Sequence, residues 1–137
     1  MKTRIIFIVS AVLILFVQIS CKKKKKDAHV PPDVSFKTGA GYVSGDCSLP
    51  KKDTIKVGII AKKTEDDLKS YNVSYSYDGA SATTTFYTYY LQSNEYGYYE
   101  KDITIITRNQ TGTEKWVFSM VDRDGNITQK SLTITVP

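Results

Sequence analysis

Residues 116–136 read WVFSMVDRDGNITQKSLTITV, and this stretch decides the fold class. On both sides of the central segment 122–126, large apolar residues alternate with polar or smaller ones, which is the pattern of a strand with one buried face. The central segment reads DRDGN and is rich in turn-forming residues, so the two halves should pair as a hairpin. Its inner face is formed by Trp116, Phe118, Met120, Leu132, Ile134 and Val136. Burying each of these side chains contributes roughly 1.5 to 3 kcal/mol before entropy is counted, so we expect them to anchor a sheet.

The same period of two recurs upstream of this hairpin. Strands are predicted for residues 34–37, 54–61, 71–77, 83–91 and 98–107. Turn signals separate them, including Asp78-Gly79 and the SNEYG bend at 93–97. In the 54–61 strand, Ile55, Val57, Ile59 and Ala61 should face inward; in the 98–107 strand, Ile103 and Ile105 should face inward and Ile106 outward. The only helical candidate is segment 64–69, which amounts to one turn at most.

Seven or eight short strands within residues 33–137 predict an all-β fold, a two-sheet sandwich of antiparallel strands. Residues 116–136 resemble the last two strands of immunoglobulin-like domains of bacterial envelope proteins. The resemblance implies an immunoglobulin-like β-sandwich over 33–137. It extends to the architecture alone, because the Cys, Trp and Cys pattern of antibody domains is absent and because such sandwiches serve many functions.

The amino-terminal segment has the pattern of a secretory leader. Lys2 and Arg4 precede an apolar run over 5–17, and Ile19-Ser20 leads into Cys21. This pattern resembles the lipobox of bacterial lipoproteins, although Gln18 stands where leucine is common. The resemblance implies a signal peptide over 1–20 and a lipidated Cys21 as the first residue of the mature chain. An uncleaved membrane anchor is the alternative; segment 5–19 would make a helix of about 22 Å, short for a hydrocarbon core of about 30 Å.

Residues 21–32 are predicted to form a flexible tether. Five consecutive lysines occupy 22–26, and Pro31-Pro32 precedes the first strand, so this segment cannot bury enough apolar area to order itself. The lysines either adhere to anionic head groups or act as a solvated spacer. The chain resembles small single-domain lipoproteins of the Bacteroidota, which implies a place in the cell envelope, at the outer membrane. Whether it faces the periplasm or the cell surface stays open, because only Asp27 follows the lysines.

The distribution of charge argues against a nucleic-acid partner. The chain carries 19 basic and 14 acidic side chains, a net charge of +5. Seven of the basic side chains precede residue 27, so residues 27–137 hold 12 basic and 14 acidic ones. The part of the chain that folds is therefore slightly acidic, and the expected partners are the membrane, through the lipid, and a protein or polysaccharide.

The inventory of reactive side chains predicts no enzyme, no metal site and no cofactor. The only histidine is His29, in the tether, so the folded domain cannot assemble a Ser-His-Asp or Cys-His arrangement. No cysteine pair has zinc spacing, and no glycine-rich phosphate loop follows a strand. Asp122, Asp124 and Asn126 resemble the start of a calcium loop. The distal glutamate is missing, however, and the segment lies where a hairpin needs turn residues.

Tyrosine is the most unusual feature of the composition, because nine of the ten tyrosines lie between residues 71 and 99. Adjacent residues on a strand point to opposite faces, so one inner face cannot absorb them all. The tyrosines either pack across strands or form an exposed platform for sugar rings or protein contact. The candidate ligand-binding residues are Tyr87, Tyr89, Tyr90, Tyr96, Tyr98 and Tyr99.

Two smaller features stay open. Cys47 is the only cysteine left once Cys21 is lipidated; it is either a small residue at a strand end or the site of a disulfide to a partner chain. Asp53-Thr54-Ile55 resembles the acceptor pattern for O-glycosylation in Bacteroidota envelope proteins. The sequence thus predicts a lipid-anchored, non-catalytic binding or interaction module. The alternatives are a structural spacer, an accessory subunit of an envelope complex, or a carbohydrate-binding module that uses exposed tyrosines.

Overall fold

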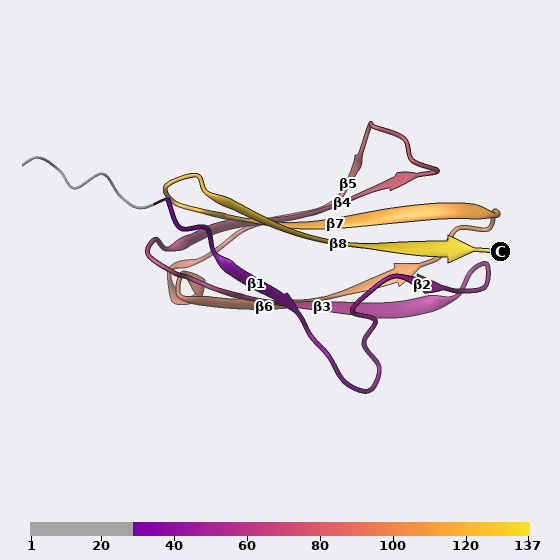
Figure 1. Ribbon diagram of the computed structural model, residues 1–137. Coiled ribbons are helices and arrows are strands. Elements are labelled where there is room, and N and C mark those ends of the chain that lie inside the picture. Colours follow the sequence, from indigo (N-terminus) through magenta and orange to yellow (C-terminus); the bar gives the residue numbers. More distant parts are fainter. Residues whose placement is uncertain (1–28) are drawn as a thin grey trace, which may run out of the picture.

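The computed structural model describes residues 29–137, which form eight strands and one short 3-10 turn (Figure 1). The predicted signal peptide, Cys21 and the lysine run lie outside the described residues. Within 29–137 there is no helix of the length and apolar character that crossing a membrane requires. The elements are β1 (Asp33–Phe36), β2 (Cys47–Ser48), β3 (Thr54–Lys62), β4 (Leu68–Tyr77), β5 (Thr84–Tyr90), η1 (Ser93–Glu95), β6 (Tyr98–Ile106), β7 (Gly112–Asp122) and β8 (Ile127–Val136).

The strands form two sheets packed face to face, which confirms the predicted two-sheet, immunoglobulin-like sandwich (Figure 1). One sheet has three strands in the order β1-β3-β6, and the other has five in the order β2-β8-β7-β4-β5. All pairs are antiparallel except β2 and β8, which run parallel where Cys47 lies opposite Ile134. That pair departs from the predicted antiparallel pattern. The chain reaches β2 from the other sheet through the long 37–46 segment, and a crossover of this length does not impose the antiparallel direction that a tight hairpin does.

The closing hairpin forms as the sequence predicts. All six predicted inner-face side chains are buried, with at most 4% of their surface exposed, and Trp116 lies opposite Leu132 in the register. The turn is held by Asp122, which is itself buried. Its carboxylate accepts hydrogen bonds from the backbone N–H and the side-chain amide of Asn126, at 2.8 and 2.9 Å. Both Asp122 oxygens therefore stabilise the turn.

The three-stranded sheet supplies the other half of the core. Val57 lies opposite Ile103 in the register of β3 and β6, and Ile55 lies opposite Ile105. All four are buried, whereas Ile106 is 65% exposed on the outer face. The inward and outward assignments made from the alternation are therefore confirmed.

The expected helical turn at 64–69 does not form, and the one short helical element lies instead at η1. Leu68 is fully buried and its backbone N–H donates to Tyr96 O at 2.8 Å, which draws the segment into β4. At η1 the Glu95 carboxylate accepts the Gln92 backbone N–H at 2.8 Å and so closes a capping box. Tertiary burial of Leu68 overrides the weak helix signal of the acidic segment, whereas local capping stabilises the turn at η1.

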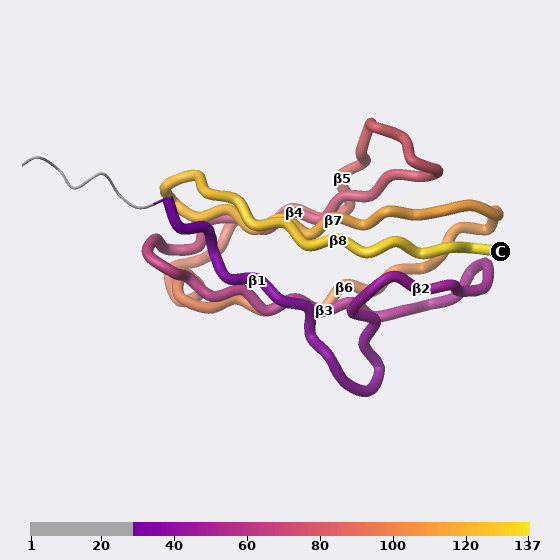
Figure 2. Tube along the Cα trace, in the orientation of Figure 1, coloured from indigo at the N-terminus to yellow at the C-terminus, as the bar shows by residue number. Residues whose placement is uncertain are grey.

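The sandwich has two distinct ends. Residue 29 lies beside the β7–β8 turn, where His29 approaches Asp124 at 3.6 Å and Thr128 donates to Pro32 O at 2.5 Å. The β4–β5 turn and the end of β8 lie at the opposite end, as the trace in Figure 2 shows. Since β7 runs between the two ends and has eleven residues, at roughly 3.3 Å per residue they are about 33 Å apart.

Candidate functional site

An open cleft lies at the end of the sandwich remote from residue 29. It has a volume of about 230 Å³ and is bounded by side chains from β4, β5, β6 and β7. Its floor is nearly buried, since only 4% of Trp116 is exposed; its rim is open, with Tyr77, Phe86 and Ile106 exposed by 40%, 47% and 65%. We call this the aromatic cleft, and it is lined by Tyr75, Tyr77, Phe86, Thr104, Ile106 and Trp116.

The aromatic rings of the cleft pack on one another. The Tyr75 ring lies 4.9 Å from that of Trp116 at an interplanar angle of 33°, and the Tyr77 ring lies 5.1 Å from that of Tyr75. Phe86 meets Trp116 edge-on, at 5.2 Å and 80°. At these separations, aromatic pairs contribute stability beyond that from burying their apolar surface. The four rings therefore form a continuous apolar wall that opens to solvent at Tyr77 and Phe86.

A β-bulge places Phe86 in this wall. Val73 of β4 pairs with Tyr87, but the next residue, Ser74, pairs with Thr85, so Phe86 is an extra residue in β5. Without the bulge, Phe86 would follow the alternation and point to the outer face, opposite to Tyr87. Bulges redirect side chains in this way and are frequent beside binding sites.

A buried carboxylate fixes the floor of the cleft. Glu114 is completely buried on the inner face of β7, two residues before Trp116. One oxygen accepts the Trp116 indole N–H at 3.1 Å, and the other accepts the Arg108 backbone N–H at 2.6 Å. Burying a carboxylate is costly unless its oxygens are hydrogen-bonded, and here both oxygens have a donor. The pairing holds the indole in one orientation.

An ion pair between Arg108 and Asp78 holds the Tyr77 side of the cleft's rim in place. The Arg108 guanidinium donates to both oxygens of Asp78, at 2.8 and 2.6 Å, and its carbon lies 5.0 Å from the centre of the Tyr77 ring. The Thr113 backbone N–H also donates to Asp78, at 2.9 Å. The hydrogen bond from Arg108, followed by that from Thr113, holds the pKa of Asp78 below its ordinary value. Residue 112 must be glycine, because its φ is 138° and an added Cβ would overlap the Arg108 guanidinium.

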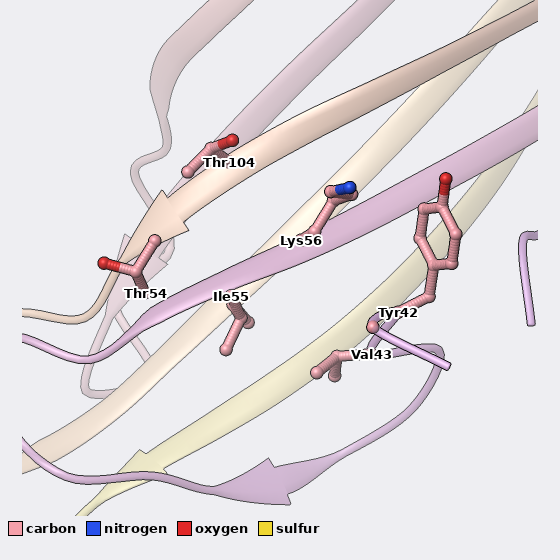
Figure 3. A pocket seen from close by; sticks show the side chains of 7 residues that line it. Tyr42, Val43, Thr54, Ile55, Lys56 and Thr104 are labelled. Carbon is pink, nitrogen blue, oxygen red and sulfur yellow. The ribbon is translucent and has the colours of Figure 1, made fainter. Parts of the chain in front are cut away.

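A second cavity, of about 420 Å³, lies on the outer face of the three-stranded sheet beside the 37–46 segment (Figure 3). Tyr42, Lys56 and Thr104 extend to the same side of the sheet in this view. The Lys56 ammonium lies 5.3 Å from the centre of the Tyr42 ring. We call this the lysine pocket, and it is lined by Gly41, Tyr42, Val43, Thr54, Ile55, Lys56 and Thr104.

The Tyr42 side of the lysine pocket is held by a polar cluster. The Tyr42 hydroxyl and the Lys37 ammonium each donate to the Asp102 carboxylate at 2.9 Å. The hydrogen bond from Lys37 is the largest of the influences that hold the pKa of Asp102 below its ordinary value. Gly58 lies beneath this cluster, and an added Cβ there would come within 2.6 Å of Lys37 Cδ and 2.9 Å of Tyr42 Cε1.

The structure distributes the six predicted ligand-binding tyrosines over several surfaces instead of one. Tyr99 is 5% exposed and lies in the core, where its ring stacks on that of Tyr89 at 5.7 Å. Tyr87 in turn stacks on Tyr89 at 6.4 Å, and both are partly buried. Tyr96 is covered by the Arg123 guanidinium at 4.0 Å. Burial, which is the largest cause, and the neighbouring Tyr87 raise the pKa of Tyr99, which is a neutral phenol.

The two remaining candidate tyrosines are exposed on separate sheets. Tyr90 is 68% exposed on β5 and Tyr98 is 48% exposed on β6, where its hydroxyl donates to Glu100 at 2.8 Å. Neither lines the aromatic cleft. They form separate surface positions and not a common platform.

Sequence reasoning did not predict the aromatic cleft. It placed Trp116 on the inner face of the closing hairpin, left Tyr75 and Tyr77 among the clustered tyrosines, and did not single out Phe86. One signal was available. Glu114 precedes Trp116, Phe118 and Met120 at the same two-residue spacing, so the alternation itself places a carboxylate on the inner face. A charged residue at an inward position marks a site where polar groups must be paired, and such sites are often functional.

Comparisons with known proteins inform the fold and leave the family unassigned. No protein-family model matches the chain, and no curated protein matches it either. Among solved structures, a chitin-binding domain from Burkholderia pseudomallei matches with a TM-score of 0.51 at 7% identity, over 69% of this chain and 58% of that one. Murine CRIg matches with a TM-score of 0.39 at 11% identity, over 78% of this chain and 97% of that one. A β-glucosidase from Listeria innocua matches with a TM-score of 0.40 at 14% identity, over 77% of this chain and 17% of that one. At 7% identity the likeness to the chitin-binding domain concerns the sandwich fold alone, and nothing follows from the two matches with TM-scores below 0.5.

Proposed function

We propose that this protein is a non-catalytic carbohydrate-binding module held at the cell envelope by a lipid on Cys21. The observation that carries the proposal is the aromatic cleft, whose exposed rim of Tyr77, Phe86 and Ile106 stands on a fixed floor at Trp116. The site differs from the tyrosine set expected from the sequence, but the ligand class is one that the sequence already suggested.

The chemistry of the cleft suits a sugar ring. Aromatic faces give large, rigid contact areas at low entropic cost, and the apolar face of a pyranose can stack on them. The β6 strand borders the cleft and is an edge strand, so backbone N–H and C=O groups on its unpaired side are available to sugar hydroxyls. The contacts of Glu114 and Arg108 hold the rings in place before binding, which lowers the entropy lost when a ligand docks.

The position of the cleft suits a binding module that is tethered to a membrane. The described chain begins beside the β7–β8 turn (Figure 1), and the residues that line the cleft lie at the other end of the sandwich. A lipid on Cys21 would therefore place the membrane near one end and the binding surface at the far end. That arrangement supports binding of an extracellular or periplasmic polymer over contact with the bilayer itself.

Binding of the full-length protein in detergent to a panel of oligosaccharides tests the proposal. Chitin oligosaccharides belong in the panel because the structural neighbour from Burkholderia pseudomallei is described as a chitin-binding domain. We expect Tyr77→Ala and Phe86→Ala to reduce affinity for the bound sugar by about tenfold each, the equivalent of about 1.4 kcal/mol. Tyr90→Ala is the matched control, because Tyr90 is more exposed but lies outside the cleft. Equal losses in all three variants, or no sugar binding at all, would leave the spacer or accessory-subunit alternatives.

Mass spectrometry of the protein extracted from membranes tests the anchor. We expect an amino-terminal peptide that begins at Cys21 and carries a diacylglycerol and an acyl chain. An inhibitor of lipoprotein signal peptidase should cause residues 1–20 to be retained. A chain that begins at Met1 both with and without the inhibitor would contradict the lipid anchor and favour the uncleaved segment.

A further inference from the structure

We propose that the aromatic cleft and the lysine pocket form one groove, and that its ligand is an acidic polysaccharide whose carboxylate binds Lys56. This inference rests on the proposed function and specifies its ligand: a uronate-containing glycan. A sugar ring would stack in the aromatic cleft, and the carboxylate of the same or the next residue would reach the Lys56 ammonium.

The two cavities are adjacent across a single edge strand. Thr104 of β6 lines both of them. In the register of β3 and β6, Lys56 lies directly opposite Thr104, and Thr54 lies directly opposite Ile106. Directly paired side chains on one face of a sheet are about 5 Å apart at their Cβ atoms. A chain of sugars that crosses the β6 edge at Thr104 would therefore pass from the aromatic rim to the lysine within about one strand spacing.

Lys56 is available to an external anion. Within residues 29–137 its ammonium forms no ion pair; it lies over the face of the Tyr42 ring, and its charge is the smallest of the influences that lower the pKa of Asp102. The carboxylate nearest in the cluster, Asp102, already accepts hydrogen bonds from Lys37 and from the Tyr42 hydroxyl. Lys37 is thereby committed to a structural ion pair, whereas Lys56 is not.

The donors around Lys56 suit a sugar carboxylate. Besides the ammonium, the pocket offers the hydroxyls of Thr54 and Thr104 and the Tyr42 ring, whereas Ile55 is buried in the core. One cation beside hydroxyl donors matches a singly charged group attached to a ring with its own hydroxyls. A phosphate carries more charge and is usually bound by an arginine fork, a glycine-rich loop or a helix end. No arginine and no helix end lines the lysine pocket, and the 37–46 segment contributes a single glycine, Gly41, to its lining.

The net charge of the folded domain does not favour an acidic ligand, so its binding must depend on individual cations near the groove. Residues 27–137 carry two more acidic than basic side chains, so a polyanion gains little from the field of the folded domain as a whole. Affinity for an acidic glycan must then arise from particular cations near the groove. This condition provides a sharp control, because removing a lysine elsewhere on the domain should have little effect.

The experiment compares acidic oligosaccharides with their neutral methyl esters. Titration calorimetry of the full-length protein in detergent would use oligomers of polygalacturonate and of alginate, each beside its methyl-esterified form. Methyl esterification removes the negative charge and keeps the ring. We expect the acidic form to bind about three- to tenfold more tightly, the range of one ordinary hydrogen bond, because exposure to solvent weakens the added attraction of the charges.

Variants separate the two halves of the groove. Lys56→Gln should abolish the preference, lowering the affinity for the acidic form to that for the methyl ester, whereas Lys56→Arg should retain the preference because it keeps the charge. Tyr77→Ala should weaken both forms equally. Lys115→Gln is the matched control, because Lys115 is exposed on β7 outside both cavities.

The outcomes distinguish this inference from the proposed function. Equal binding of acid and ester, with loss in Tyr77→Ala, would overturn the role of Lys56 and keep the carbohydrate site. Equal loss of acidic binding in Lys56→Gln and Lys115→Gln would show general attraction to the domain and would also overturn it. Absence of binding to any glycan, acidic or neutral, would overturn the proposed function together with the inference.

Discussion

At the scale of single residues, Glu114 couples the core to the aromatic cleft. It is fully buried and accepts hydrogen bonds from the Trp116 indole and the Arg108 backbone. Glu114→Gln replaces one acceptor by an amide that donates, and this leaves one of the two N–H groups without a partner. We expect the free energy of unfolding to fall by about 1 to 3 kcal/mol. Urea denaturation followed by fluorescence measures it, because Trp116 is the only tryptophan.

The matched control for Glu114 is Glu65→Gln, which makes the same chemical change at an exposed position. Its stability should stay within about 0.5 kcal/mol of the unmodified protein. The Glu114 variant should also shift the emission of native Trp116, because the indole loses its fixed partner. Unchanged stability and emission in Glu114→Gln would show that the buried carboxylate does not position the indole.

Asp78 makes the stability of the protein depend on pH in the acid range. The hydrogen bonds from Arg108 and Thr113 hold its pKa below the ordinary value of 3.8. Its contribution to stability is therefore complete above pH 3.8, the unfolded value, and is lost as the pH falls through the lower folded value. We expect Asp78→Asn to be less stable than the unmodified protein at pH 7 and to approach it in strong acid. Thermal melts across this pH range test the convergence, and a constant difference down to the lowest pH would contradict it.

At the scale of elements, β3 depends on a glycine at the centre of its outer face. An alanine Cβ at residue 58 would lie within 2.9 Å of atoms of Lys37, Tyr42 and Asp102. Such contacts force the neighbours to shift, which costs about 1 to 3 kcal/mol. Gly58→Ala should therefore destabilise the fold, displace the 37–46 segment and disrupt the lysine pocket. Thermal melting measures the first effect, and the nuclear magnetic resonance shifts of Tyr42 report the second.

Gly45→Ala is the control for that change, because an added Cβ at residue 45 meets nothing within 4 Å and its φ is not in the left-handed region. It should leave the melting temperature almost unchanged. If both glycine variants melt alike, the cluster over β3 is not tightly packed. The comparison separates the crowding at residue 58 from the general effect of removing a glycine.

At the scale of the whole molecule, the two sheets share one hydrophobic core, so residues 29–137 should unfold in a single step. Buried residues of β1, β3, β4, β6, β7 and β8 belong to one contiguous cluster. A domain of this size with one core usually unfolds without stable intermediates. We expect the denaturation curves from Trp116 fluorescence and from far-ultraviolet circular dichroism to coincide. A fluorescence transition at lower denaturant would mean that the cleft end opens before the rest.

Most of the fold was predictable, because burial on one face leaves a period of two in the sequence. The closing hairpin, the inner face of β3 and the outward position of Ile106 were all read correctly from that period. The failures occurred where distant contacts override local signals. Leu68 draws the 64–69 segment into β4, and the crossover from the other sheet makes β2 parallel to β8.

The binding surface was much less predictable. Exposed tyrosines were expected from their number, but which ones are covered depends on the widths of the two sheets and on which strand lies over which. The bulge at Phe86 is likewise set by the pairing of β4 with β5, since the sequence of β5 alone permits either face for this ring. Only Glu114, by its inward position, gave a local sign of the cleft.

The sequence by itself determined the strands, their buried faces and an all-β sandwich, because each depends on neighbours two residues apart and on turn residues between them. Only the tertiary structure decided where a ligand can bind. The cleft draws its walls from β4, β5, β6 and β7, and the lysine pocket adds β3 and the 37–46 segment. These surfaces exist because sheet packing brings together residues far apart in the chain, and a two-residue period carries no information about that packing.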